Sequence, residues 1–355
     1  MKRKPIILDL FSGCGGLSKG FMDAGYEVAL GVDNEPQSLK TFKLNHGNSD
    51  ILELDLFEKD SMQKIKKALT GKKPDVIVGG PPCQGFSLTG TRNFDDKRNH
   101  LYLSMIDAVK EFKPKAFLVE NVPGLTRLYG GTVKDEIIKR FTELGYTVSM
   151  QILCAADYGV PQMRKRVVFI GLKKGLGKFE FPKPLLDPDH YVSSSDALGD
   201  LPSREKDFGD EKDTYTSLPR TDYQKKMRGK QKVLMNHVAT KHTDLVKSII
   251  AQVPEGGNHK DLPKGVGGNR NFNEAWTRYH SKKPSRTIDT GHRNHFHYKY
   301  NRVPTVRENA RLQSFPDDFE FIGTRTSQNR QVGNAVPPLL GYNIARQLLK
   351  YLNNV

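Results

Sequence analysis

The stretch "VIVGGPPCQGFS", Val76 to Ser87, decides the fold class of this sequence. It begins with three apolar residues, typical of a buried strand, and then breaks into two glycines and two prolines with Cys83 at the bend. Proline restricts φ, so the direction of the thiol is set before any ligand arrives. A cysteine kept for packing would lie within a strand or helix. Cys83 instead follows a strand tip, which is where a nucleophile is mounted.

Short apolar runs alternate with amphipathic runs on both sides of this stretch, through the first 170 residues. The apolar runs predict strands, and the longer runs between them predict helices over 17–25, 35–46, 100–112 and 134–148. The strands are expected over 6–11, 26–33, 52–57, 74–80, 115–122 and 167–172. This alternation predicts an α/β fold with a doubly wound, mostly parallel sheet, whose ligands lie at the carboxyl ends of the strands.

The pattern breaks near Phe181, and the rest of the chain predicts a second, smaller and irregular domain. The stretch 187–213 is polar and acidic, which favours a hinge or connector over a core element. Residues 221–310 then hold 18 Lys and Arg against 7 Asp and Glu. The terminal run 337–352 is an amphipathic helix that needs an apolar partner. We therefore predict a larger domain over 1–180, completed by 325–355, and a second domain over 181–324.

The overall composition predicts a soluble protein of the cytosol. The formal net charge is +16, and no run approaches the roughly 18 apolar residues of a membrane helix. The three cysteines, Cys14, Cys83 and Cys154, lack paired spacings, so reduced thiols and no metal site are expected. The basic segment is either a solvated surface or a site for a phosphate backbone. Concentrated charge in one segment favours the second interpretation.

A glycine turn and two acids predict a nucleoside pocket. In "DLFSGCGG", Asp9 to Gly16, the turn directly follows the first predicted strand, where glycine lets the backbone approach a ligand. Asp33 ends the second strand, where a carboxylate can accept hydrogen bonds from ribose hydroxyls, and Asp55 ends the third. The loop has no lysine and no second phosphate clamp. An adenosine without polyphosphate fits such a pocket, and S-adenosylmethionine is a ligand of this kind.

Three more charged residues are predicted near Cys83. The strand "KAFLVENV" ends at Glu120, which a parallel sheet places beside Cys83. A carboxylate beside a thiolate would not raise the nucleophilicity of the sulfur, so we expect it to act on the substrate. At N3 of a cytosine it would draw electron density from C6 and make that carbon open to attack. In "PQMRKRVVFIG", Arg164 and Arg166 are two apart, so in extended chain both would face the crevice.

Taken together, these motifs resemble the bacterial C5-cytosine-specific DNA methyltransferase family of restriction–modification type. The motifs "DLFSGCGG", "GGPPCQGFS", "ENV", "PQMRKR", "TVRENARLQSFPDDF" and "QVGNAVPPLL" occur in the family's order and spacing, and only about 181–285 lies outside the resemblance. The resemblance implies an S-adenosylmethionine-dependent methyltransferase fold, with a catalytic and cofactor-binding domain over 1–180 and 325–355 and a target-recognition domain over 181–324. It also implies transient addition of Cys83 to C6 of a flipped cytosine, with Glu120 at N3 and Arg166 and Arg164 holding the base. The implied cofactor-binding residues are Phe11, Gly13, Asp33, Asn34, Asp55, Leu56, Gly80, Pro82 and Asn334.

The resemblance also implies the partners. These are a specific sequence of double-stranded DNA, read by the basic segment, and a restriction endonuclease linked in function without contact. A monomer associated with the bacterial nucleoid, without a membrane partner, is expected. The segment 84–99 is rich in glycine and polar residues, and we predict that it closes on DNA.

Three other interpretations remain open at the level of sequence. A tRNA cytosine-C5 methyltransferase of the same fold would use the same pocket, although the large basic insert favours DNA. A catalytically silent DNA-binding protein conflicts with the presence of Cys83, Glu120 and both arginines. An NAD-dependent enzyme with a reactive thiol conflicts with the missing GxGxxG pattern.

Overall fold

The computed structural model describes residues 3–82, 101–268, 275–291 and 294–352. The chain forms two compact units. The sheet unit comprises Met1–Cys154, Lys165–Lys183 and Pro338–Val355, and the second unit comprises Ala155–Arg164 and Pro184–Pro337. The sequence placed the corresponding boundaries at 180/181 and 324/325. Residues 155–164 and 325–337 therefore pack within the second unit.

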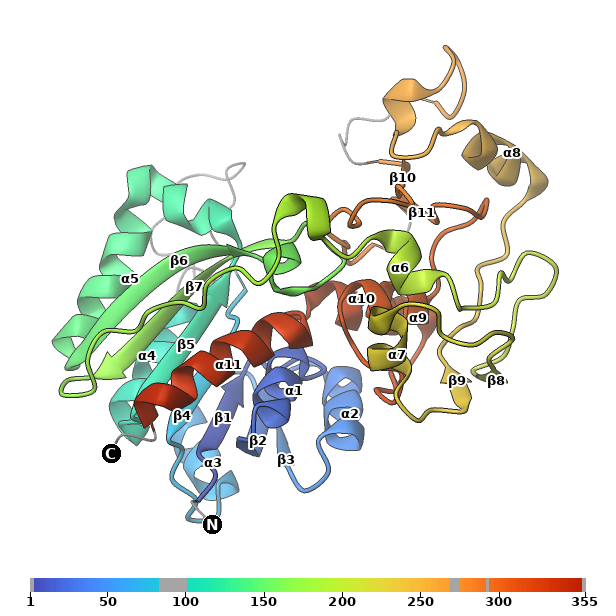
Figure 1. Cartoon of the computed structure of the whole chain (residues 1–355). Helices are drawn as coiled ribbons and strands as arrows, with labels where there is room; N and C mark the ends of the chain where they lie inside the picture. The colour runs from blue at the N-terminus through green and yellow to red at the C-terminus, as the bar shows by residue number, and fades with distance from the viewer. Residues whose placement is uncertain (1–2, 83–100, 269–274, 292–293, 353–355) are drawn as a thin grey trace. The chain divides into compact units, whose positions relative to one another are not determined.

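The sheet unit is built on seven strands in the order β3-β2-β1-β4-β5-β7-β6 (Figure 1). Its central strands are buried along their length, as in β1, where all five residues are buried. Helices join the successive parallel strands. The elements in chain order are β1 (Ile6–Leu10), α1 (Gly16–Asp23), β2 (Glu27–Asp33), α2 (Pro36–Asn45), β3 (Asp50–Glu53), α3 (Ser61–Ala68), β4 (Val76–Gly79), α4 (Leu101–Phe112), β5 (Ala116–Asn121), η3 (Pro123–Gly131), α5 (Thr132–Glu143), β6 (Tyr146–Cys154), β7 (Lys165–Lys173) and α11 (Pro338–Leu352).

The first five strands are parallel, and the last two are not. β1 pairs in parallel with β2 and β4, β2 with β3, and β4 with β5. β7 runs antiparallel to both β5 and β6. The helix predicted over 134–148 ends at Glu143, and the chain continues directly into β6, a strand that the sequence analysis did not identify. The doubly wound, mostly parallel sheet is confirmed, with an antiparallel hairpin at one end.

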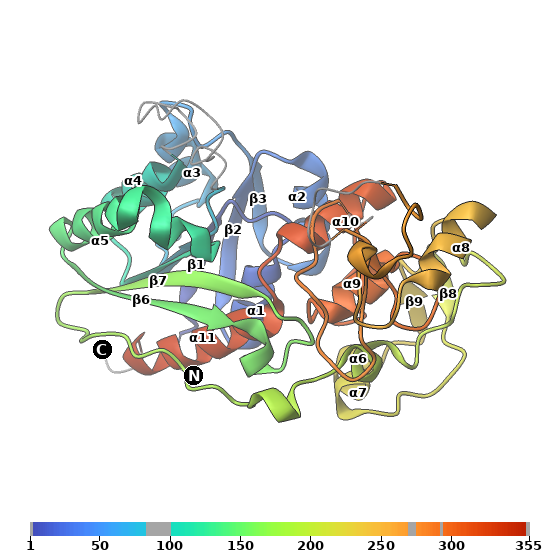
Figure 2. The ribbon, with the colours of Figure 1, turned by 90° about the horizontal axis from the view of Figure 1, so that it is seen from above.

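Helices cover both faces of the sheet. α4 and α5 lie on one face, and α1 and α11 lie together on the other (Figures 1 and 2). α11 approaches α1 closely because both carry glycine there: a Cβ added to Gly20 would lie 2.4 Å from the carbonyl oxygen of Pro338. Tyr26 also donates a hydrogen bond to the carbonyl of Ala345 at 3.1 Å. The terminal helix thus finds its apolar partner in the sheet unit.

The second unit has short elements joined by long irregular segments. Its two small sheets pair β10 with β11 and β8 with β9. Among the described helices of the whole chain, none is both long and apolar enough to cross a membrane. The elements are η4 (Ala155–Tyr158), η5 (Pro188–His190), α6 (Ser194–Leu198), β8 (Lys212–Thr214), α7 (Asp222–Arg228), β9 (Val233–Met235), α8 (Asp244–Gln252), η6 (His259–Asp261), β10 (Thr277–Arg278), β11 (His295–Phe296), α9 (Val306–Leu312) and α10 (Arg325–Asn334).

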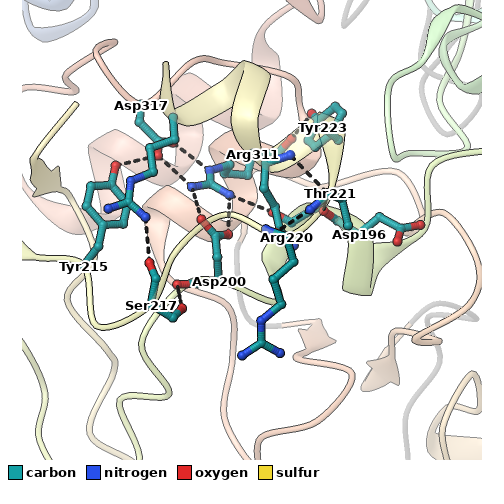
Figure 3. A network of polar contacts seen from close by, with 12 residues as sticks. Asp196, Asp200, Tyr215, Ser217, Arg220, Thr221, Tyr223, Arg311 and Asp317 are labelled. Carbon is teal, nitrogen blue, oxygen red and sulfur yellow. Dashed lines mark hydrogen bonds and ion pairs between the residues drawn. The ribbon is translucent and has the colours of Figure 1, made fainter. Parts of the chain in front are cut away.

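Buried ion pairs take the place of a large apolar core in part of this unit. Arg311 is fully buried, and its Nη1 donates to Asp200 Oδ1 at 2.7 Å while its Nη2 donates to Asp317 Oδ2 at 2.7 Å (Figure 3). Tyr215 also donates its hydroxyl to Asp317, at 2.6 Å. Asp200 belongs to the stretch 187–213 that the sequence predicted as a hinge or connector. That prediction is wrong for Asp200, because an acidic residue there neutralises a buried arginine.

Candidate active site

The carboxyl edge of the sheet has a topological switch point at β1. From β1 the chain moves to β2 on one side, and it later returns as β4 on the other side. The crevice at such a point is where open α/β sheets bind ligands. The loop after β1 and the turn after β4 both leave the sheet here, so the two glycine motifs of the sequence lie on neighbouring strands.

The loop after β1 holds a backbone conformation that leaves room beside it. Phe11 has φ 55°, and Gly13 and Gly15 have φ 52° and 90°. A Cβ on Gly13 would meet nothing within 4 Å, whereas one on Gly15 would collide with the ring of His46. Gly15 is therefore needed for packing behind the loop, and Gly13 faces open space.

Asp33 holds this loop from the neighbouring strand. It is the last residue of β2, and its Oδ2 accepts a hydrogen bond from Gly13 N at 2.8 Å while its Oδ1 accepts one from Glu35 N at 2.9 Å. Burial raises the pKa of Asp33, and the backbone hydrogen bonds from Gly13 and Glu35 oppose the rise. The carboxylate still has lone pairs for a ligand that donates hydrogen bonds.

The next predicted residues lie just beyond β3 and β2. Asp55 follows the end of β3 at Glu53, is exposed, and accepts a hydrogen bond from Phe57 N at 3.0 Å. Leu56 is buried, while Asn34 is exposed next to Asp33. The structure thus brings Asp33, Asn34 and Asp55 to the ends of adjacent strands, and Asp33 contacts the loop after β1.

Glu120 and Arg166 form an ion pair on the same edge of the sheet. Arg166 Nε lies 2.8 Å from Glu120 Oε1, and the two side chains are 13% and 11% exposed. The other carboxylate oxygen faces β4: a Cβ on Gly80 would lie 3.0 Å from Glu120 Oε2. Glycine at position 80 therefore lets the carboxylate sit against the turn that leads to Cys83.

Asn121 fixes that turn from β5. Its Nδ2 donates to the carbonyl of Pro81 at 2.9 Å, and its Oδ1 accepts from Val122 N at 2.8 Å. Pro82 is exposed and is the last described residue before Cys83. Cys83 itself and the predicted closing segment 84–99 lie outside the described residues.

Two predicted site residues belong to the second unit. Arg164 lies just before β7, which begins at Lys165. Its guanidinium is buried, and Nη2 donates to the carbonyl of Gly333 at 3.0 Å while Nη1 lies 3.5 Å from that of Ile288. Asn334 ends α10 and is exposed. The ion pair of Glu120 therefore involves only Arg166 of the two arginines.

Several residues at the edge were not singled out by the sequence analysis. Asp9 is 2% exposed, and burial raises its pKa to about 7, against a hydrogen bond from Ser18. Asn121 directly follows Glu120 in the motif "ENV", and this position was the sequence signal that it lies at the site. Cys14 is buried, and burial raises the pKa of its thiol to about 12, so this cysteine is not a candidate nucleophile.

Comparison with known proteins identifies the family. The sequence profile described as C-5 cytosine-specific DNA methylase matches residues 6–350. The chain belongs to this family. It is therefore a DNA (cytosine-5)-methyltransferase. The methyltransferase is 40% identical over 350 residues to Type II methyltransferase M1.HphI of Haemophilus parahaemolyticus, which covers 98% of this chain and 87% of that protein.

Two further comparisons agree. Type II methyltransferase M.DdeI of Desulfomicrobium norvegicum is 37% identical, over 98% of this chain and 89% of that protein. A prophage-encoded E. coli protein assigned as a DNA modification methyltransferase superposes with a TM-score of 0.80 at 28% identity, covering 99% of this chain and 100% of that one. The methyltransferase thus matches relatives along almost its whole described length, second unit included.

Proposed function

We propose that this methyltransferase transfers a methyl group from S-adenosylmethionine to C5 of a flipped cytosine in a specific double-stranded DNA sequence, through a transient bond from Cys83 to C6. One observation carries the proposal. Glu120 has one carboxylate oxygen on Arg166 Nε at 2.8 Å and the other against Gly80, the residue that opens the turn to Cys83. A carboxylate held there can bind N3 of a cytosine whose C6 lies at the thiol.

The residues at the switch point fit S-adenosylmethionine. Gly13 faces open space, and Asp33 keeps lone pairs beside it for the ribose hydroxyls. Asp55 is exposed at the end of the next strand, within the same edge. When bound, the cofactor supplies an electrophilic methyl group on a sulfonium. The chain would hold it with Phe11, Gly13, Asp33, Asn34, Asp55, Leu56, Gly80, Pro82 and Asn334.

The protein's own groups account for activation of the base. The thiolate of Cys83 adds to C6, which makes C5 nucleophilic, and a hydrogen bond or proton from Glu120 at N3 stabilises the charge that moves into the ring. Arg166 orients that carboxylate and holds the base. After C5 has gained the methyl group, loss of the C5 proton to a base and expulsion of Cys83 restore the aromatic ring.

Base flipping and sequence recognition complete the proposal. C6 is unreachable inside a stacked duplex, so the cytosine has to leave the helix at a cost of a few kcal/mol. The second unit carries most of the basic segment, in which Lys and Arg outnumber Asp and Glu by 11 between residues 221 and 310. That charge suits a phosphate backbone, and we expect log affinity to fall by about 0.9 per log unit of salt for each phosphate neutralised. A restriction endonuclease that reads the same sequence would be the functional partner.

DNA with 5-fluorocytosine at the target tests the mechanism directly. Bisulfite sequencing of a plasmid from expressing cells first gives the methylated sequence. Fluorine cannot leave C5 as a proton does, so the duplex should remain covalently attached to the protein in denaturant, and the adduct should map to Cys83. Cys83→Ser should fold and form no adduct. A wild-type enzyme that methylates DNA but forms no adduct, or an adduct that persists in Cys83→Ser, would refute the proposed mechanism.

A further inference from the structure

Two glutamines face each other in the interior of the second unit. Gln162 and Gln313 are both 0% exposed, and Gln162 Nε2 donates to Gln313 Oε1 at 2.5 Å. The two residues are 151 positions apart in the sequence. We call this pair the glutamine clasp. A buried amide pair is stable only when its remaining donors and acceptors also find partners, so each side of the clasp has to be followed outward.

Gln162 ties the arginine segment to two other segments. Its Oε1 accepts a hydrogen bond from Ile288 N at 3.0 Å, and its Nε2 is 3.2 Å from the carbonyl of Leu312. The backbone beside it also pairs with Ser285, which donates to the carbonyl of Pro161 at 3.0 Å. Gln162 therefore fixes the path of the chain just before Arg164 and Arg166.

Gln313 ties the other side of the clasp to the end of α10. Its Nε2 donates to the carbonyl of Val332 at 2.9 Å and to that of Ala335 at 3.0 Å. Arg164 donates to the carbonyl between them, that of Gly333, at 3.0 Å. These carbonyls surround Asn334, a proposed cofactor residue. Helix ends leave carbonyls without intrahelical partners, and here the clasp and Arg164 supply donors.

We propose that the glutamine clasp is a positioning device that couples the segment leading into Arg166 to the turn that carries Asn334. The inference rests on the proposed function, because it uses the roles assigned there to Arg166 and Asn334. Neither glutamine needs to touch DNA or cofactor. Their amides set where two separate segments lie, and loss of either amide leaves buried carbonyls or an N–H group unsatisfied. Affinity for cofactor and reactivity toward the base should then change together.

The experiment compares three clasp variants with a matched control in the full-length enzyme. Gln162→Met, Gln313→Met and the double variant keep side-chain length but remove the amide. Gln63→Met makes the same change on α3, where the side chain is exposed. The readouts are the Kd of S-adenosylmethionine by calorimetry and the single-turnover rate of adduct formation on 5-fluorocytosine DNA at saturating cofactor. Both are measured well below the melting temperature of each variant.

Gln313→Met should raise the Kd about tenfold, equivalent to 1.4 kcal/mol, and should also slow adduct formation. Gln162→Met should do the same, and the double variant should lose less than the product of the two single losses, because the residues act as one unit. Should Gln313→Met not fold, Gln313→Asn carries the same test with a shortened amide. Its Kd should rise by a smaller factor.

The outcomes separate this inference from the proposed function. If wild-type enzyme binds cofactor and forms the adduct while the clasp variants match Gln63→Met in both readouts, the clasp is only structural and the inference is overturned. A variant that melts at a lower temperature with unchanged Kd and rate overturns it as well. If wild-type enzyme itself forms no adduct, the proposed mechanism fails, and the role of the clasp fails with it.

Discussion

Two carboxylates of the sheet unit and two of the second unit respond to burial in opposite ways. In the sheet unit, burial raises the pKa of Asp9 to about 7 and also raises that of Asp33, and their described partners are a hydroxyl and backbone N–H groups. In the second unit, burial alone would raise the pKa of Glu308 and Asp317. The guanidinium groups of Arg302 and Arg311 instead lower both.

This difference separates a binding edge from a structural core. In the second unit these buried carboxylates form ion pairs with buried arginines. Removing one partner leaves the other as an uncompensated charge in the protein interior. The sheet unit keeps carboxylates whose charged form is poorly stabilised by the protein, so they gain most from a ligand that donates hydrogen bonds or carries positive charge. Glu120 combines both features, since it is paired with Arg166 and still lies at the edge.

The largest expected effect tests that combination. Glu120→Gln should reduce the rate of methylation by about 10²- to 10⁴-fold, the usual contribution of a positioned general acid or base. Its amide oxygen can still accept from Arg166, so the melting temperature should change by only a few degrees. Methylation of the target duplex and thermal melting measure the two quantities. A large loss of stability with little loss of rate would place Glu120 with the structural carboxylates instead.

Arg311→Met should have the next largest effect, on stability rather than chemistry. The variant removes the guanidinium that Asp200 and Asp317 share and leaves Asp317 only Arg307, 3.9 Å away, which costs about 3–5 kcal/mol. Urea unfolding of the variant should show this loss. Arg330→Met, at an exposed position of α10, is the matched control and should be nearly neutral. Equal stability of the two variants would contradict the structural role.

Acid should weaken the second unit through its buried histidines. Burial lowers the pKa of His237 to about 4 and that of His297 to about 3, below the usual 6.5. At these two histidines the unfolded chain binds more protons than the folded one between those values, so they lower the free energy of unfolding as pH drops below about 6.5, while the raised pKa of Asp9 acts in the opposite direction. The slope is about 1.4 kcal/mol per pH unit for each histidine.

Urea unfolding at a series of pH values measures this slope. The two ring nitrogens of His237 form hydrogen bonds with Thr305 Oγ1 at 2.8 Å and with the carbonyl of Pro202 at 2.9 Å. His237→Gln should therefore flatten the slope by about one proton. A His237→Gln variant whose slope from pH 6.5 to 4.5 equals that of the wild type would show that His237 is accessible to protons in the folded state.

The parallel part of the sheet could be predicted because its signals are local. Apolar runs bounded by glycine or acid indicated the strands, and the residues at their ends, Asp33 and Glu120, lie where the parallel arrangement places them. The last helix could be placed as well, because its apolar stripe needed a partner. These inferences use only the spacing of apolar residues along the chain and the residues that begin or end each element.

The remaining features depend on contacts that sequence spacing does not encode. Only Leu144 and Gly145 separate α5 from β6, and β7 pairs with β6 only after the chain has passed through the second unit. The spacing of Arg164 and Arg166 predicted a common direction. The strand begins between them, and the first arginine binds carbonyls 124 and 169 residues away. Asp200 likewise lies in a stretch whose polar composition predicted a connector, and only the structure shows that it pairs with the buried Arg311.

The smallest expected effect compares one substitution in both regions. Asp33→Asn should raise the Kd of S-adenosylmethionine by about tenfold, because a neutral amide forms weaker hydrogen bonds than a carboxylate. Stability should fall by less than in the counterpart below: the amide keeps one of the two hydrogen bonds from Gly13 N and Glu35 N, and the charge that it removes is disfavoured by burial. Asp317→Asn is the counterpart and should lower stability clearly, because Arg311 loses one of its two carboxylate partners. Calorimetry and urea unfolding of both variants provide the comparison. If both lose stability to the same extent, Asp33 is a structural carboxylate and the distinction between the two units does not hold.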